Sequence, residues 1–295
     1  MMKKITQVVI LYNPKSTGAS KDNAEALYHT LEKQLPPSCT LKIRKTEYAG
    51  HGEKIARFYA KQTPTTLLIS SSGDGGYNEV INGALSVSPA HVVTGVLPSG
   101  NANDHWNALG KEDITKDILT SHYKMIDVIK VSSVIGGQPW VRYAHSYVGI
   151  GVSPVIGKQL TKTKLNVINE KWLLLKQLFT FAYSKIIVNG KTVKYSSLLF
   201  SNIDRMSKVI RLSDELNVSD GKFEIHAVRH QTTYKILLYL LTAVTVGVQE
   251  HASKDSYEFT TITPLLIQLD GEVYKLDAHA KVSIESAHNA LTCIV

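Results

Sequence analysis

Residues 65–80, TTLLISSSGDGGYNEV, decide the fold. The first six residues are apolar enough for a buried strand, the Ser/Gly/Asp run is typical of a turn, and the last residues belong to a helix. The same order is expected at four places. The expected strands cover residues 5–12, 39–46, 65–70 and 91–97, and the expected helices cover residues 21–35, 50–63, the stretch through 79–81, and 103–109. Four alternations predict an α/β fold with a doubly wound, mostly parallel sheet and helices on both faces.

The pattern changes after about residue 123, where strands dominate. Strands are expected at residues 126–134, 138–150, 186–193, 195–202, 223–228, 260–269 and 281–284, with helices inserted at 165–184 and 232–246. This predicts a β-sandwich-like C-terminal domain with inserted helices. With the boundary near 125–135, we expect one domain at residues 1–129 and a β-rich domain at residues 130–295.

The composition is that of an ordinary globular protein, with 295 residues, 43% hydrophobic and 20% charged. Two cysteines, Cys39 and Cys293, cannot form a disulfide framework or a Cys-rich zinc site. The longest apolar run, residues 236–248, is shorter than a bilayer span, and residues 5–12 are too short and interrupted for a signal sequence. We therefore expect a cytoplasmic protein. Its net charge of +8 favours anionic partners such as nucleotides or anionic lipid surfaces.

Three turns follow strands of the expected parallel sheet, at residues 13–18, 72–76 and 98–104. Ligands of doubly wound sheets bind beyond the carboxyl ends of the strands, so all three turns would line one rim. Glycines allow the backbone to approach a phosphate, and amides at the start of a helix favour an anion. Any one turn alone is explained as a tight strand-to-helix connection, but the three together predict a nucleotide site, with Lys15 as a cationic contact.

Several common motifs are absent from the sequence. It has no P-loop motif, and residues 73–75 lack the third glycine of a dinucleotide fingerprint. It also has no zinc-protease H-E-x-x-H motif, no G-x-S-x-G nucleophile elbow and no zinc-deaminase signature. These enzyme classes are therefore excluded.

Five motifs, taken in order, are similar to those of one known family. N-P-x-S/A-G is matched by residues 13–18 with one extra residue, G-G-D-G-T-x-N-E-V by residues 72–80, and L-P-x-G-T-x-N-D by residues 97–104. D-G-K and D-G-E are matched by residues 220–222 and 270–272. The chain thus resembles the bacterial diacylglycerol kinase-like lipid kinases, which are related to eukaryotic diacylglycerol and sphingosine kinases and, more distantly, to NAD kinases.

The resemblance implies transfer of the ATP γ-phosphoryl group to a lipid hydroxyl, with ATP in a cleft between the two domains. The residues implied in nucleotide binding are Asn13, Pro14, Lys15, Ser16, Thr46, Gly73, Asp74, Gly75, Gly76, Glu79, Gly100, Asn101, Asn103 and Asp104. Asp74, Asp270 and Glu272 are the implied catalytic residues, and we favour Glu272 as the general base, with Asp270 second. A carboxylate that takes the hydroxyl proton assists the attack. Mg²⁺ is expected near Asp74 and Asp104, to neutralise the triphosphate.

The family also has a structural metal at the D-G-K turn. The implied ligands are the Asp220 carboxylate and the carbonyls of Asn217 and Lys222. The alternative is a plain hairpin turn, since Asp-Gly is itself a hairpin signal.

Three residues depart from the family pattern. Ser72 replaces the first glycine of G-G-D-G-T, Gly76 replaces its threonine, and Asn101 replaces the threonine of the third motif. Loss of one hydrogen bond to a charged phosphate costs about 1.5–3 kcal/mol, so altered nucleotide handling or a slower enzyme is expected. A degenerate member that binds nucleotide or lipid without turnover remains an alternative.

The acceptor is the remaining question. The apolar, aromatic stretch at residues 165–187 has lysine flanks and suits either a helix that contacts an anionic membrane or a core helix. We expect a diacylglycerol-like lipid presented at a membrane surface, with peripheral contact at the inner membrane. A soluble acceptor, as in the NAD kinases, is the alternative. No motif in the sequence indicates nucleic-acid binding. A homodimer is one alternative for the assembly of the protein.

Overall fold

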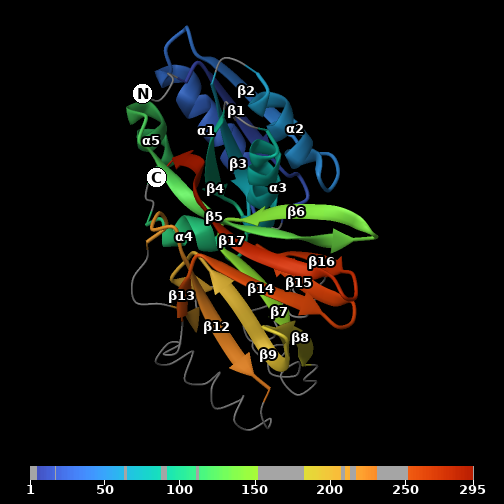
Figure 1. The fold of residues 1–295 in the computed structure, drawn as a ribbon. Helices are drawn as coiled ribbons and strands as arrows, with labels where there is room; N and C mark the ends of the chain where they lie inside the picture. The colour runs from blue at the N-terminus through green and yellow to red at the C-terminus, as the bar shows by residue number, and fades with distance from the viewer. Residues whose placement is uncertain are drawn as a thin grey trace. The chain divides into compact units, whose positions relative to one another are not determined.

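The computed structural model describes residues 5–16, 18–62, 65–87, 92–110, 113–151, 183–206, 210–212, 217–230 and 252–294. The chain divides into two compact units, the first made of Met1–Asp127 and His288–Val295 and the second of Val128–Ala287 (Figure 1). The helices expected at residues 165–184 and 232–246 lie outside the described residues, apart from residues 183–184 at the end of the first. Residues 183–184 are not helical, and β8 begins at Ser184.

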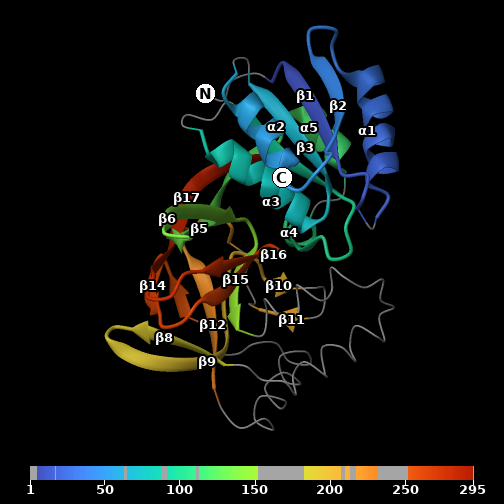
Figure 2. The same ribbon diagram turned by 90° about the vertical axis from the view of Figure 1, so that its right-hand side faces the viewer.

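The first unit is built on a parallel sheet in the order β4-β3-β1-β2. These strands are β1 (Gln7–Tyr12), β2 (Thr40–Lys45), β3 (Thr66–Ser72) and β4 (Val92–Pro98). The helices are α1 (Ser20–Gln34), α2 (His51–Ala60), α3 (Asp74–Leu85), α4 (Asp104–Ala108) and α5 (Ile114–Thr120). Every residue of β3 is buried, because α1 lies on one face of the sheet and α2 and α3 lie on the other (Figure 2). The prediction of a mostly parallel N-terminal α/β sheet is confirmed.

The end of the chain returns to this first unit. Strand β17 (Lys281–Ile294) is far longer than the expected 281–284, and Cys293 pairs in parallel with Thr94 of β4. Nearby, Oδ1 of Asp127 accepts hydrogen bonds from the Asn289 amide (2.7 Å) and from Nδ1 of His288 (2.9 Å). The first unit therefore includes a segment that the division at 129/130 would have left in the second.

The second unit is rich in antiparallel strands. In sheet order, β16 (Glu272–Leu276), β15 (Leu265–Leu269), β7 (Tyr147–Gly151), β9 (Lys191–Ser201), β8 (Ser184–Val188), β14 (Ser256–Thr261) and β17 are hydrogen-bonded neighbours. β12 (Phe223–Arg229) pairs with β9 and with β13 (Ala252–Lys254), while β5 (Tyr123–Ile135) pairs with β6 (Gln138–Ala144) and β17. The two-residue strands β10 (Arg205–Met206) and β11 (Ile210–Arg211) form a separate pair. This strand-rich C-terminal region agrees with the predicted fold class.

Three of the expected strands are divided in the structure. The strand expected at 138–150 breaks at His145 and Ser146, and the one expected at 260–269 breaks before Pro264. The strand expected at 186–193 reverses at Asn189 and Gly190, whose φ angles of 50° and 74° suit a two-residue hairpin turn. Apolar content alone predicts each of these stretches as one continuous strand.

Helices α2 and α3 pack closely at Gly83, and this contact predicts a large stability loss for Gly83→Ala. A Cβ at this position would lie 2.3 Å from the Glu53 carbonyl oxygen and 2.7 Å from the Ala56 Cβ. Since backbone cannot rotate away, we expect the free energy of unfolding to fall by about 1–3 kcal/mol, the usual cost of overpacking. Urea unfolding measures the change. Lys33→Ala, at an exposed position of helix α1, is the control, and an equal loss in both variants would contradict the prediction.

In the second unit, Asp277 links the β5–β6 turn to the loop after β16 and predicts a pH-dependent contribution to stability. Its carboxylate accepts the amides of Gly137 (2.8 Å) and Gly136 (3.0 Å), and these bonds hold its pKa below the ordinary 3.8. Because the folded-state pKa is the lower one, the stabilisation is complete above the unfolded pKa and is lost as pH falls through the folded pKa. We expect Asp277→Asn to be less stable than wild type at pH 6, with the difference closing below about pH 3.8. Thermal unfolding across this range measures it, and a pH-independent difference would refute it.

Candidate active site

The three glycine-containing turns meet at the carboxyl ends of β1, β3 and β4. Oγ of Ser16 in the first turn donates to the Ser99 carbonyl in the third (2.9 Å), and the Ser99 amide donates to the Ser72 carbonyl at the second (3.0 Å). The sequence analysis expected these turns on one rim, and their hydrogen bonds join them there.

Two glycines allow these turns to touch through their backbones. A Cβ on Gly100 would lie 2.5 Å from the Gly73 Cα, and a Cβ on Gly18 would lie 2.4 Å from the Ser99 carbonyl oxygen. No side chain fits at either contact. The rim therefore presents main-chain atoms, including amides at the start of α3 that have no acceptor within the helix.

Beneath the turns lies a buried polar network that the sequence analysis did not single out. The Ser71 hydroxyl donates to the Ser20 carbonyl (2.7 Å) and lies 3.0 Å from the Ser99 hydroxyl, to which Nδ2 of Asn23 also donates (2.9 Å). The Ser20 hydroxyl in turn donates to the Ser71 carbonyl. Because satisfied buried networks rigidify their surroundings, this one fixes the relative position of the turns.

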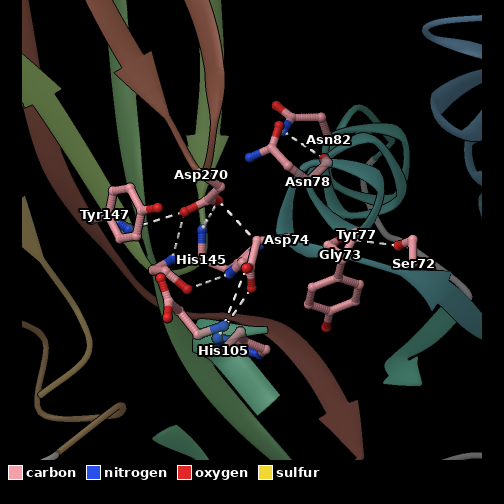
Figure 3. A network of polar contacts seen from close by, with 12 residues as sticks. Ser72, Gly73, Asp74, Tyr77, Asn78, Asn82, His105, His145, Tyr147 and Asp270 are labelled. Carbon is pink, nitrogen blue, oxygen red and sulfur yellow. Dashed lines mark hydrogen bonds and ion pairs between the residues drawn. The ribbon is translucent and has the colours of Figure 1, made fainter. Parts of the chain in front are cut away.

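Asp74, the first residue of α3, connects the second turn to the third. Its two carboxylate oxygens accept the amides of Asp104 (3.1 Å) and His105 (3.2 Å), at the start of α4 (Figure 3). Behind it, the His105 ring packs on Tyr77, with 5.2 Å between centroids, and the Tyr77 hydroxyl is 2.9 Å from the Thr94 hydroxyl.

Among the other residues expected at the nucleotide site, Glu79 and Asn103 hold backbone segments in place, and the remainder lie in or beside the three turns. Glu79 accepts the amides of Gly50 (2.7 Å) and Gly52 (2.9 Å), so it supports the start of α2. Asn103 closes the third turn by bonding both the amide and the carbonyl of Gly100 (2.9 Å each). The residues that lie in or beside the three turns are Asn13, Pro14, Lys15, Ser16, Thr46, Gly75, Gly76, Asn101 and Asp104. Of these, Pro14, Lys15 and Asn101 are exposed.

In the second unit, Asp270 and Gly271 form the two-residue turn between β15 and β16, with φ angles of 46° and 97°. The Asp270 side chain is buried and accepts the amides of His145 (2.7 Å), Ser146 (3.0 Å) and Tyr147 (3.0 Å). Figure 3 shows this carboxylate beside His145 and Tyr147. These bonds account for the break between β6 and β7, where the sequence analysis expected one strand.

The His145 ring extends the contacts of Asp270. Its Nε2 lies 3.3 Å from Oδ2 of Asp270, and its Nδ1 lies 2.7 Å from the Ser146 hydroxyl. Glu272, the first residue of β16, is exposed instead. The two carboxylates of the D-G-E motif thus have different surroundings, one enclosed by backbone amides and the other open to solvent.

At the D-G-K turn, two side-chain oxygens each accept a hydrogen bond from the backbone amide two residues further along the chain. Oδ1 of Asn217 accepts the Ser219 amide (3.2 Å), and Oδ1 of Asp220 accepts the Lys222 amide (3.0 Å). Within the described residues, no group of three or more His, Cys, Asp or Glu side chains could hold a metal ion. The expected site has only one carboxylate and two carbonyls, so it stays a prediction.

The fold is similar to those of two solved kinases. A crystal structure of a diacylglycerol kinase from Bacillus anthracis str. Sterne matches with a TM-score of 0.68 and 19% identity, covering 99% of this chain and 97% of that one. Yeast NADH kinase, solved with NADH, matches with a TM-score of 0.53 and 9% identity, covering 99% of this chain and 84% of that one. Both matches concern the fold.

Sequence comparison finds similarity to one known family in the N-terminal part of the chain. Residues 7–131 match the family model described as the diacylglycerol kinase catalytic domain, which confirms the predicted resemblance. A diacylglycerol kinase of Staphylococcus epidermidis is 32% identical over 139 residues, covering 42% of this chain and 39% of the relative. One from Bacillus subtilis (strain 168) is 25% identical over 235 residues, covering 73% and 71%. The staphylococcal match thus spans about two fifths of that relative's length.

Proposed function

We propose that the protein is an ATP- and Mg²⁺-dependent lipid kinase that phosphorylates a hydroxyl of diacylglycerol or a related lipid. The observation that carries the proposal is the backbone contact between Gly73 and Gly100, which together with the Ser16–Ser99 bond makes one main-chain rim from three turns. Such a rim matches the negative charge of a triphosphate. The diacylglycerol kinase family of residues 7–131 supports the acceptor class.

The turns would bind the phosphates through amides of Gly75 and Gly76, with Lys15 adding a positive charge. Asp74 and Asp104 would hold Mg²⁺, directly or through water, and the ion would neutralise charge that develops on the transferred group. Asp74 also accepts two amides from the third turn, so it keeps the turns in register while it faces the nucleotide.

We assign the general base to Glu272. As the lipid oxygen forms a bond to the γ-phosphorus, the bond from that phosphorus to the β–γ bridging oxygen breaks, ADP leaves, and the hydroxyl proton passes to the Glu272 carboxylate. Glu272 is exposed, whereas both oxygens of Asp270 accept backbone amides. Asp270 would therefore shape the turn that carries Glu272.

The acceptor would be met at a membrane surface. The net charge of +8 favours an anionic lipid interface, and none of the helices in the described part of the chain is long and apolar enough to cross a bilayer. On the basis of this charge we propose peripheral association at the inner surface of the cell membrane. Separately, Asp220, Asn217 and Lys222 would form a structural metal site of the second unit.

Incubation with labelled ATP, Mg²⁺ and a lipid panel in mixed micelles tests the proposal. Diacylglycerol, phosphatidylglycerol, ceramide and a sphingoid base form the lipid arms, and NAD without lipid forms a further arm. We expect label on a lipid. Label on NAD alone would identify a soluble-acceptor kinase, and ATP binding without transfer in any arm would identify a non-catalytic member.

A further inference from the structure

We propose that Ser72 is a positioning residue of the phosphate-facing turn, and that its side chain is the reason residue 76 is glycine. This inference rests on the proposed nucleotide site. It explains two departures from the G-G-D-G-T pattern, a serine in place of the first glycine and a glycine in place of the threonine, as one exchange.

The two positions compete for the same space. A Cβ on Gly76 would lie 2.6 Å from both Cβ and Oγ of Ser72, closer than such atoms approach. Apart from the two neighbouring residues and the helix's own backbone, no other heavy atom of the described residues lies within 4 Å of that Cβ. A side chain can therefore occupy position 72 or position 76, but not both. Because Cβ of Ser72 is one of the two obstructing atoms, rotation of the hydroxyl does not relieve the overlap.

Ser72 also holds the turn through its polar atoms. Its hydroxyl lies 2.8 Å from the Ser70 hydroxyl and donates to the Gly73 carbonyl (3.0 Å), and that carbonyl accepts the Tyr77 amide (3.2 Å) in the first turn of α3. The Ser72 carbonyl accepts the Ser99 amide (3.0 Å) from the third turn. Ser72 is buried, and Figure 3 shows it beside Gly73 at the start of α3.

These contacts give Ser72 two separable effects. Its Cβ excludes any side chain at position 76, and its hydroxyl fixes the Gly73 carbonyl from which α3 begins. Asp74, Gly75 and Gly76 follow directly, so the hydroxyl sets the position of the amides assigned to the phosphates. At this point of the turn the hydroxyl comes from the strand that precedes it, and the helix contributes only backbone at position 76.

Five variants separate these effects: Gly76→Thr, Ser72→Ala, Ser72→Gly, and the doubles Ser72→Gly/Gly76→Thr and Ser72→Ala/Gly76→Thr. Without nucleotide, we expect Gly76→Thr to lower the melting temperature by about 2–10 °C because of overpacking. With nucleotide, we expect its KM for ATP to rise about ten- to hundredfold. The double with Ser72→Gly should lower KM to the rise of about three- to tenfold expected from loss of the Ser72 hydroxyl alone, while the double with Ser72→Ala, which keeps the obstructing Cβ, should not show this recovery.

Ser72→Ala tests the positioning role alone, because it keeps Cβ and removes the hydroxyl. We expect the KM for ATP to rise about three- to tenfold, the effect of one hydrogen bond, with kcat unchanged. An unchanged KM would overturn the positioning role and leave Ser72 as a filler of space. Equal recovery in the two doubles would overturn the steric exchange.

The nucleotide-free melting temperatures keep the inference separate from the proposed function. If wild type neither binds nor uses ATP, the proposed function fails, and the melting temperatures still decide whether positions 72 and 76 are coupled. Additive changes in the Ser72→Gly/Gly76→Thr cycle would refute the coupling whatever the protein binds.

Discussion

Replacing Glu272 with glutamine is expected to lower kcat by about 10²–10⁴-fold, the usual contribution of a general base. Glutamine keeps the size and exposure of the side chain at the start of β16 but cannot take a proton. Since the side chain is exposed and the hairpin turn precedes it, the fold should not change. The KM for ATP and the melting temperature should therefore match wild type, which steady-state kinetics and thermal unfolding measure.

Two matched variants make this prediction specific. Glu258→Gln changes an exposed glutamate of β14 that pairs with Lys281 (2.9 Å), and it should keep wild-type kcat. Asp270→Asn should instead lower stability by about 1–3 kcal/mol, because its amide group cannot accept from all the backbone amides that Asp270 now bonds. If Asp270→Asn lost kcat with unchanged stability and Glu272→Gln kept it, the base would be Asp270.

Most of the first unit was predictable because its four parallel strands and its longer helices carry local signals. A buried apolar strand such as β3 and a periodic helix such as α1 can be recognised within their own residues. Helix α5 was missed because Ile114–Thr120 is too short for a clear period. One signal could have found it, since Asp113 accepts the amides of Thr115 (2.9 Å) and Lys116 (3.3 Å) as an N-cap.

The second unit was less predictable because distant residues end its strands. The break at His145 and Ser146 is made by the carboxylate of Asp270, which lies 125 residues further along the chain from His145. No local pattern reports such a contact. The turn at Asn189 and Gly190 is different, since this dipeptide is a strong hairpin signal that the sequence offered.

At the candidate site, motifs predicted the glycines and Asp74 but not what holds them. Ser20, Ser71 and Ser99 are buried under the turns, yet serine at the end of a strand or the start of a helix has no distinctive spacing. In the sequence alone, the serine at position 72 and the glycine at position 76 are two separate departures from the G-G-D-G-T pattern. The overlap of their side-chain positions, which makes it one change, is a property of the folded turn.

Gly100→Ala is expected to abolish tight nucleotide binding by separating the second and third turns. The added Cβ would lie 2.5 Å from the Gly73 Cα and 3.1 Å from the Gly73 nitrogen, so the overlap is with backbone and no rotamer avoids it. Oδ1 of Asn103 would also lie 3.1 Å from the new Cβ. It would have to move, and its hydrogen bond from the Gly100 amide would break. A shift of about 1 Å in such a site costs about 10²-fold in rate or affinity.

Gly73→Ala supplies the matched control, because it adds one methyl group to the other side of the same contact. There the new Cβ would lie 3.2 Å from the Gly100 Cα, a distance that a shift of a few tenths of an ångström relieves. Calorimetry with ATP and Mg²⁺ should therefore find weak or no binding for Gly100→Ala and a smaller loss for Gly73→Ala. Equal losses of ATP affinity in the two variants would mean that affinity depends on the flexibility of glycine. A larger loss for Gly73→Ala than for Gly100→Ala would show that the two turns do not need this contact to form the rim.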